Sequence, residues 1–162
     1  MSSTPSTERT PAGAEILAQV WKSSKSHDIA LLIPEFVPPG ARALEIDERL
    51  PMIGSSVFAW GAPYGEALVP MDGLVQDLLI GSRAIQGAGG PIDAIQVGIS
   101  VAPGSSGGPL LALNGRVIGV MSRRGETRDG TGTGKSFAVA TRVFWQEAQS
   151  FVPPPAPRYR PQ

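Results

Sequence analysis

The chain has 162 residues, which is enough for one compact unit with a hydrophobic core of its own. Lysine plus arginine balance aspartate plus glutamate at 14 each, so neither a nucleic-acid partner nor a charged membrane surface is indicated. Cysteine is absent, which excludes a disulfide framework and a thiolate metal site.

The N-terminal segment, residues 1–13, is rich in Ser, Thr and Pro, and this composition predicts disorder. It lacks the apolar core of a secretory signal peptide, so a genuine start at Met1 would leave the protein in the cytoplasm. No apolar run approaches the roughly 20 residues that a membrane span needs. Residues 14–22 fit either a strand or a short helix, and hydrophobic periodicity alone does not decide between them.

Short apolar runs bounded by turn residues fill most of the remaining chain. Residues 29–34 are expected to form a buried strand, followed by a break at Pro38-Pro39-Gly40. Six more strands are predicted, at residues 55–61, 72–80, 92–99, 109–113, 116–122 and 136–140. These six are enough for one closed barrel. Residues 141–151 predict a short helix, and the proline-rich tail at 152–162 predicts a loose, extended segment.

The strongest local signal is Asn114-Gly115, which lies between two apolar runs. Asn-Gly favours the tight turn of a two-stranded hairpin, because both central positions of that turn need positive φ. The sequence therefore predicts a hairpin centred on this dipeptide.

A serine-containing stretch precedes the hairpin and reads Gly104-Ser105-Ser106-Gly107-Gly108-Pro109. Three glycines in five residues are costly unless the backbone needs unusual φ values or a close approach. A serine in such a loop can present its hydroxyl beside free backbone N–H groups, which are the donors of an oxyanion hole. From these residues alone, a glycine-rich turn and a nucleophile site are equally well supported.

Two competing motifs fit less well. The nucleophile elbow of α/β-hydrolases, G-x-S-x-G, must lead into a helix and be followed by a histidine, whereas here Pro109 and a hairpin follow and no histidine occurs after Ser106. The glycine-rich stretch at residues 130–136 looks like a phosphate-binding loop, but Asp129 occupies the place of its first glycine. The residues after it are strand-like, so a glycine-rich hairpin loop is the favoured interpretation.

With its flanks, the serine stretch resembles the trypsin-like serine peptidases, in particular the disulfide-free bacterial HtrA-like branch. The hallmark of that branch reads approximately I-Q-T-D-x-x-I-N-P-G-N-S-G-G-P-L, followed by a hairpin and G-F-A-I-P. The matching residues are Ile95-Gln96, Pro103-Gly104, Ser106-Gly107-Gly108-Pro109-Leu110 and Phe137-Ala138, whereas Val97-Gly98 and Ser105 depart from it. Weaker matches, Asp28-Ile29-Ala30-Leu31-Leu32 and Gly61-Ala62-Pro63-Tyr64-Gly65, extend the resemblance over roughly residues 14–146.

The resemblance implies an all-β, chymotrypsin-like fold, in which the active site lies between two antiparallel β-barrels. Residues 50–151 would form a complete six-stranded second barrel with a short C-terminal helix. Residues 14–49 would be the remnant of a partial first barrel, so the chain is expected to be N-terminally incomplete. An open first barrel would leave an unpaired strand edge, and self-association is therefore expected.

The resemblance also implies a trypsin-like serine endopeptidase and its catalytic residues. Ser106 would be the nucleophile, the N–H groups of Gly104 and Ser106 the oxyanion hole, and Asp28 the acid that orients the general base. No metal and no other cofactor is implied, and the partner is a peptide or protein substrate.

Five further residues would bind the substrate. The resemblance puts Ser100 at the base of the primary pocket and Lys135 near the pocket wall. Ser122-Arg123-Arg124 would pair with the substrate backbone. The alternative for these basic groups is an ordinary solvent-exposed position.

The general base is missing from this pattern, because the family order is His, Asp, Ser. The single histidine, His27, is the immediate neighbour of Asp28, and adjacent residues in an extended chain point to opposite faces. Three interpretations follow: a peptidase whose sequence here starts too late, a short binding module without catalysis, or a subunit completed by a partner chain. We favour the first, because residues 14–22 match the strand that precedes the acid in the family.

Overall fold

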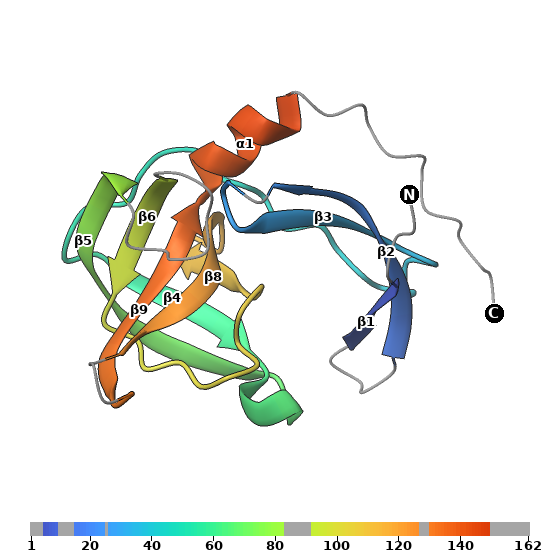
Figure 1. Ribbon diagram of the computed structural model, residues 1–162, viewed down its shortest axis with the longest axis horizontal. Coiled ribbons are helices and arrows are strands. Elements are labelled where there is room, and N and C mark those ends of the chain that lie inside the picture. The colour runs from blue at the N-terminus through green and yellow to red at the C-terminus, as the bar shows by residue number, and fades with distance from the viewer. Residues whose placement is uncertain (1–4, 10–14, 25, 83–91, 127–129, 150–162) are drawn as a thin grey trace.

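A computed structural model describes residues 5–9, 15–24, 26–82, 92–126 and 130–149 (Figure 1). The expected loop at residues 87–91 and the expected tail at 152–162 lie outside these residues. The described strands are β1 (Pro5–Arg9), β2 (Glu15–Ser24), β3 (Ile29–Pro34), β4 (Ser56–Gly61), β5 (Val69–Ser82), β6 (Ile92–Val97), β7 (Pro109–Ala112), β8 (Val117–Glu126) and β9 (Gly132–Ala140). A 3₁₀ turn, η1 (Pro63–Gly65), follows β4, and the helix α1 (Thr141–Gln149) follows β9.

Six strands close into a barrel in the order β4-β5-β6-β9-β8-β7, and all neighbours are antiparallel. The barrel stands apart from the N-terminal strands in Figure 1, with α1 above it. On β4, Val57 and Ala59 are buried whereas Phe58 and Trp60 are exposed, as the alternation of a strand dictates. The expected all-β fold with one complete six-stranded barrel and a short C-terminal helix is confirmed.

The barrel core consists of small and branched apolar side chains that point inward from all six strands. Its fully buried members include Ile95, Leu110 and Met121. A second cluster lies under α1 and is made of Ile92, Ala94, Val139 and Val143. Among the described residues, no helix is long and apolar enough to cross a membrane.

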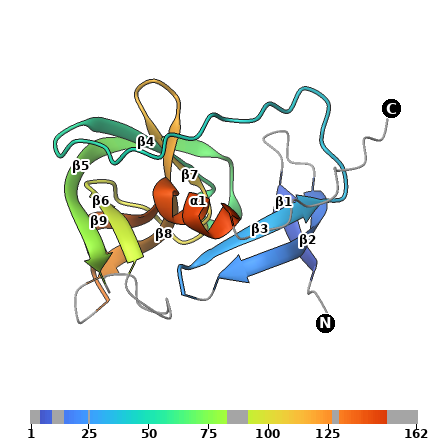
Figure 2. The same cartoon turned by 90° about the horizontal axis from the view of Figure 1, so that it is seen from above.

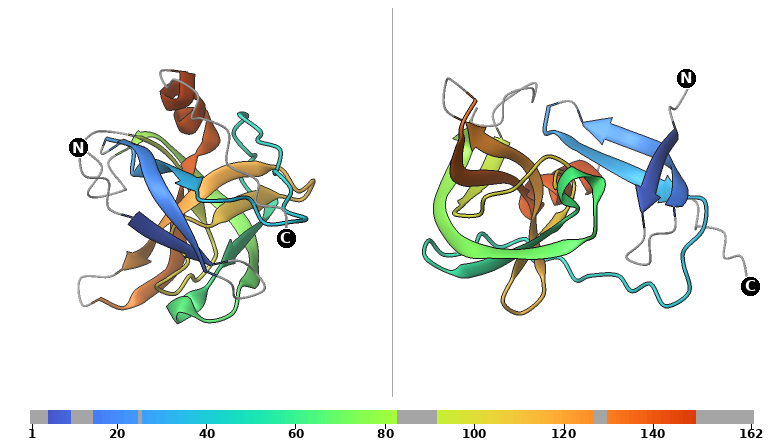
Figure 3. Two further views of the ribbon diagram at one scale, coloured as in Figure 1. Left: turned by 90° about the vertical axis from the view of Figure 1, so that its right-hand side faces the viewer. Right: turned by 90° about the horizontal axis from the view of Figure 1, so that it is seen from below.

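The N-terminal strands form a separate three-stranded antiparallel sheet in the order β1-β2-β3. Figures 2 and 3 show this sheet beside the barrel, with the turn between β2 and β3 directed at it. Of the two alternatives for residues 14–22, the structure forms a strand over the described residues 15–22, as part of β2. It differs from the expected disorder of the N-terminus at residues 5–9, which form β1 and pair with β2. Only Ile16 and Ala18 of β2 are fully buried, whereas Ile29 of β3 packs against the cluster under α1.

Residues 45–47 of the connection from β3 to β4 attach it to the barrel at the start of β8. The carbonyl of Glu45 accepts the N–H of Val117 at 2.8 Å, and the N–H of Asp47 donates to the carbonyl of Val117 at 2.9 Å. The hydroxyl of Thr141 donates to the carbonyl of Asp47 at 2.5 Å. Residues 45–47 therefore hold the start of β8 and the start of α1 together.

Strands β8 and β9 are longer than the sequence indicated. Their pairing runs on through Arg124 opposite Ser136 to Glu126 opposite Gly132. The glycine-rich stretch at 130–136 is thus largely strand rather than the expected loop, because β8 supplies a partner for its backbone. The extension forms a ribbon next to the loop that carries Ser106.

Candidate active site

The loop between β6 and β7 carries Ser106, and its glycines are required by close backbone contacts. Gly104 has a φ of 98°, which favours glycine. A side chain at Gly104 would collide with the carbonyl of Ala62, which flanks η1. The N–H of Tyr64 donates to the carbonyl of Pro103 at 2.7 Å. The loop is therefore pressed against the turn that follows β4.

Backbone hydrogen bonds fix the loop to β8. The N–H of Gly107 donates to the carbonyl of Met121 at 2.7 Å, and the N–H of Met121 donates to the carbonyl of Gly108 at 2.8 Å. Within the part of the chain that the structure describes, the N–H groups of Gly104 and Ser106 have no acceptor. Two free donors therefore belong to the same short loop as the exposed Ser106.

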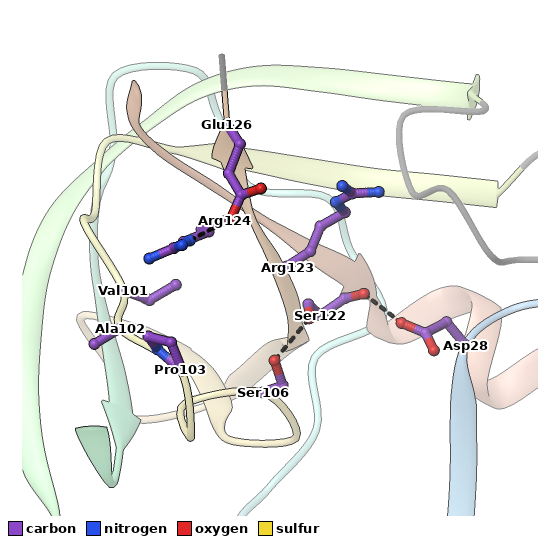
Figure 4. A pocket seen from close by; sticks show the side chains of 9 residues that line it. All are labelled: Asp28, Val101, Ala102, Pro103, Ser106, Ser122, Arg123, Arg124 and Glu126. Atoms are coloured by element: carbon purple, nitrogen blue, oxygen red, sulfur yellow. Dashed lines mark hydrogen bonds and ion pairs between the residues drawn. The ribbon is translucent and has the colours of Figure 1, made fainter. Parts of the chain in front are cut away.

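One residue of β8, Ser122, contacts both the serine and the acid that the sequence singled out. The Ser106 hydroxyl donates to the Ser122 carbonyl at 2.8 Å, and the Ser122 hydroxyl donates to Oδ2 of Asp28 (Figure 4). Asp28 has a φ of 52°, a conformation that costs energy in a residue with a side chain. The chain bends there, at the start of β3, and the carboxylate reaches the barrel.

His27 lies outside this constellation. Its Nδ1 is 3.0 Å from the hydroxyl of Ser24, within the hairpin that joins β2 to β3. It does not line the cavity in which Asp28 and Ser106 meet. His27 therefore lies apart from the cavity that Asp28 and Ser106 line.

The cavity has a volume of about 590 Å³ and lies between the serine loop and β8. It is lined by Asp28, Val101, Ala102, Pro103, Ser106, Ser122, Arg123, Arg124 and Glu126. Ser100 and Lys135, both exposed, are not among the lining residues. Among the described residues, no group of three histidine, cysteine or acidic side chains could hold a metal ion.

Glu126 is a lining residue that the sequence interpretation did not single out. Its Oε1 accepts a hydrogen bond from Nε of Arg124 at 2.6 Å. Residues two apart in a strand share a face, so the pair could have been found had β8 been predicted beyond residue 122.

A closed antiparallel barrel with an exposed serine on a glycine-rich loop and a carboxylate nearby defines the chymotrypsin-like class of serine peptidases. Residues 2–120 match the family model of the trypsin-like peptidase domain. The chain belongs to this trypsin-like peptidase family.

Curated relatives include a probable periplasmic DegP-like serine endoprotease of Ectopseudomonas mendocina, 32% identical over 141 residues that make up 84% of this chain and 27% of the relative. The chloroplastic protease Do-like 1 of Arabidopsis thaliana is 40% identical over 72 residues, which are 43% of this chain and 16% of that protein. The chain thus spans about a quarter or less of the length of these relatives.

Solved structures share the fold. The HtrA-type protease AlgW with a tripeptide has a TM-score of 0.76 at 22% identity, over 90% of this chain and 47% of that one. Rv3671c from M. tuberculosis has a TM-score of 0.67 at 26% identity, over 84% of this chain and 65% of that one. The expected chymotrypsin-like fold of the HtrA type is confirmed.

Proposed function

We propose that this chain supplies the nucleophile, the oxyanion hole and the orienting acid of a serine endopeptidase. The observation that carries the proposal is the connected line Ser106–Ser122–Asp28 along one cavity. In the proposed reaction, Oγ of Ser106 attacks the carbonyl carbon of a peptide bond. The negative charge that develops on the carbonyl oxygen is stabilised by the free N–H groups of Gly104 and Ser106, and each such donor contributes roughly 10²- to 10³-fold to kcat.

The proton of Ser106 needs a base. The Ser122 carbonyl, which accepts this proton's hydrogen bond, is a neutral amide and cannot take the proton. An imidazole bound between Ser106 and Asp28 could take it, and Asp28 would hold the ring in the required tautomer. Because His27 is directed at Ser24, we infer that this imidazole belongs to a residue outside the present sequence, on the same polypeptide or on a partner chain.

Free imidazole tests the proposal. We expect p-nitrophenyl ester hydrolysis by the chain to rise with imidazole above the rate of imidazole alone, because the small base can enter the cavity beside Ser106. Ser106→Ala should abolish the excess and Asp28→Asn should reduce it. Ser23→Ala, on the exposed surface of β2, is the matched control and should retain it. An excess rate that survives in Ser106→Ala would contradict the assignment of the nucleophile.

A peptide-binding module without catalysis is the second candidate, favoured by the position of the single histidine away from the cavity. Such a module would bind extended peptides along β8 with no turnover at any imidazole concentration. The same titration therefore separates the two functions.

A further inference from the structure

Arg124 places a cation inside the cavity that begins at Ser106. In Figure 4 its side chain extends from β8 toward the wall of Val101 and Ala102, whereas Arg123 extends to the opposite side, as alternation along a strand requires. Ser106 lies at one end of this space, and Arg124 with Glu126 lies at the other. A substrate side chain that entered beside Ser106 would meet Arg124.

A single hydrogen-bond partner, Glu126, orients the guanidinium of Arg124 within the part of the chain that the structure describes. Its Nε donates to Oε1 of Glu126 at 2.6 Å, and both side chains are about 40% exposed. Its two Nη groups have no partner among the residues that the structure describes. A guanidinium held through Nε still presents its Nη1–Nη2 edge, and two parallel N–H donors on such an edge match the two oxygens of a carboxylate.

We propose that Arg124, oriented by Glu126, selects an acidic side chain in the substrate residue whose carbonyl is attacked. This inference rests on the proposed function, because Ser106 defines which residue that is. The wall opposite Arg124 is apolar: Val101 is buried, and Ala102 and Pro103 complete it. Arg124 remains 39% exposed, so dissolved salt screens its attraction for a carboxylate.

The charged groups that line the cavity are balanced, two carboxylates and two guanidinium groups, so the selection depends on which of them a substrate side chain meets. Glu126 is already paired with Arg124, and Asp28 accepts the hydroxyl of Ser122. Arg123 adds a second positive charge with no partner among the described residues. A lysine or arginine side chain that extended from Ser106 toward Arg124 would meet this cation, whereas the carboxylate of Asp28 lies on the other side of Ser106 (Figure 4).

Tripeptide boronic acids of the form acetyl-Ala-Ala-X test this selection, because boron forms an ester with a serine hydroxyl by exchange for one of its own hydroxyl groups, which leaves with the serine proton as water. X carries a glutamate, glutamine or lysine side chain, and affinity is measured by calorimetry at low and high salt. We expect the glutamate compound to bind about tenfold more tightly than its glutamine isostere. The preference should shrink as salt rises.

Two arginine variants locate the selecting group. Arg124→Gln should remove the preference for glutamate, and Arg123→Gln, which removes the second lining cation, should only reduce it. Arg42→Gln, at an exposed arginine that does not line the cavity, is the control and should retain the preference in full. Equal binding of the glutamate and glutamine compounds, preferred binding of the lysine compound, or loss of the preference only in Arg123→Gln would each overturn the inference.

A fluorophosphonate without a peptide separates this inference from the proposed function. Reaction at Ser106 together with equal boronic-acid affinities would overturn the acidic selection alone. No reaction at Ser106, even with imidazole, would overturn the proposed nucleophile, and the acidic selection, which is defined relative to Ser106, would be overturned with it.

Discussion

The hydroxyl of Ser106 donates to the backbone carbonyl of Ser122 across 2.8 Å, and this bond joins the serine loop to β8. The same residue, Ser122, donates its own hydroxyl to Asp28 on the strand β3 side of the cavity. One residue of the barrel thus links the proposed nucleophile to a carboxylate that lies 78 positions earlier in the chain. The Ser106 hydroxyl donates to a neutral carbonyl that cannot remove its proton, so the proposed nucleophile requires a base.

We predict that the purified chain hydrolyses casein at best very slowly. Loss of the base of such a triad costs on the order of 10⁶ in kcat, and oxyanion stabilisation with substrate binding leaves roughly 10³- to 10⁴-fold over water. The measurement is release of fluorescent peptides from labelled casein. Turnover at ordinary peptidase rates that disappears in Ser106→Ala would show that a base is present after all.

Replacement of Gly61 by alanine should destabilise the chain by about 1–3 kcal/mol. A Cβ at Gly61 would lie 2.6 Å from both Cβ and Oγ of Ser105, which is itself fully buried beside the nucleophile. Urea unfolding measures the change. Gly132→Ala is the control, because nothing lies within 4 Å of its Cβ, and it should be close to neutral. Equal stability of the two variants would contradict the tight packing of the serine loop on β4.

Asp47 should make the chain sensitive to acid. Hydrogen bonds from Arg49 lower the pKa of the Asp47 carboxyl from 3.8 to about 2. Because the pKa of Asp47 is lower in the folded state than in the unfolded chain, the ionised carboxylate stabilises the fold above pH 3.8. This contribution to the free energy of unfolding is lost as the pH falls toward 2. Arg49→Gln should raise the pKa of Asp47 and lower stability at pH 6, with little difference from the parent chain below pH 2.

The pKa of Asp47 is measured from its carboxyl carbon resonance as pH is varied. Arg42→Gln is the control, an exposed arginine earlier in the same connection that is expected to leave the titration unchanged. An Asp47 that titrates near 3.8 in the unmodified chain would refute the predicted acid sensitivity.

The N-terminal sheet should exchange its amide hydrogens faster than the barrel. Of the side chains in β2 and β3 whose exposure the structure describes, only Ile16 and Ala18 are buried, and Leu17 and Trp21 remain 54% and 40% exposed. A small open sheet with exposed apolar side chains is marginal by itself and invites pairing through its edges. We expect weak protection over residues 15–34, strong protection beyond residue 50, and sedimentation coefficients that rise with concentration. Uniform protection in a monodisperse monomer would contradict this prediction.

Local chemistry explains which parts of the fold the sequence revealed. Asn114-Gly115 predicted the β7–β8 hairpin, but its turn is not the two-residue turn expected, because Asn114 does not have a positive φ and the N–H of Gly115 donates to the carbonyl of Ala112 at 2.9 Å. In the structure Gly115 has a φ of 79°, and the side-chain oxygen of Asn114 accepts the N–H of Arg116 at 3.1 Å. The serine motif could likewise be read from its own residues, because its glycines are required at their own positions in the loop.

Features that depend on distant partners were missed. Residues 132–135 look like a loop because glycine is a poor strand former, and only pairing with β8 makes them a strand. The contact between Asp28 and Ser122 spans 94 positions, and the positive φ of Asp28 carries no sequence signal strong enough to predict it. Glu126 was not predicted as a lining residue for the same reason as residues 132–135, because β8 extends to Glu126 only by pairing with β9.

The reactivity of the Ser106 hydroxyl is the most direct test of the proposed function. The chain is incubated with a small fluorophosphonate and imidazole, and the modified residue is identified by mass spectrometry of its peptides. We predict a single adduct on Ser106 that depends on imidazole, decreases in Asp28→Asn and is absent in Ser106→Ala. Adducts spread over exposed serines such as Ser23 and Ser56, or the same labelling in Ser106→Ala, would contradict the proposal that this barrel carries a serine peptidase nucleophile.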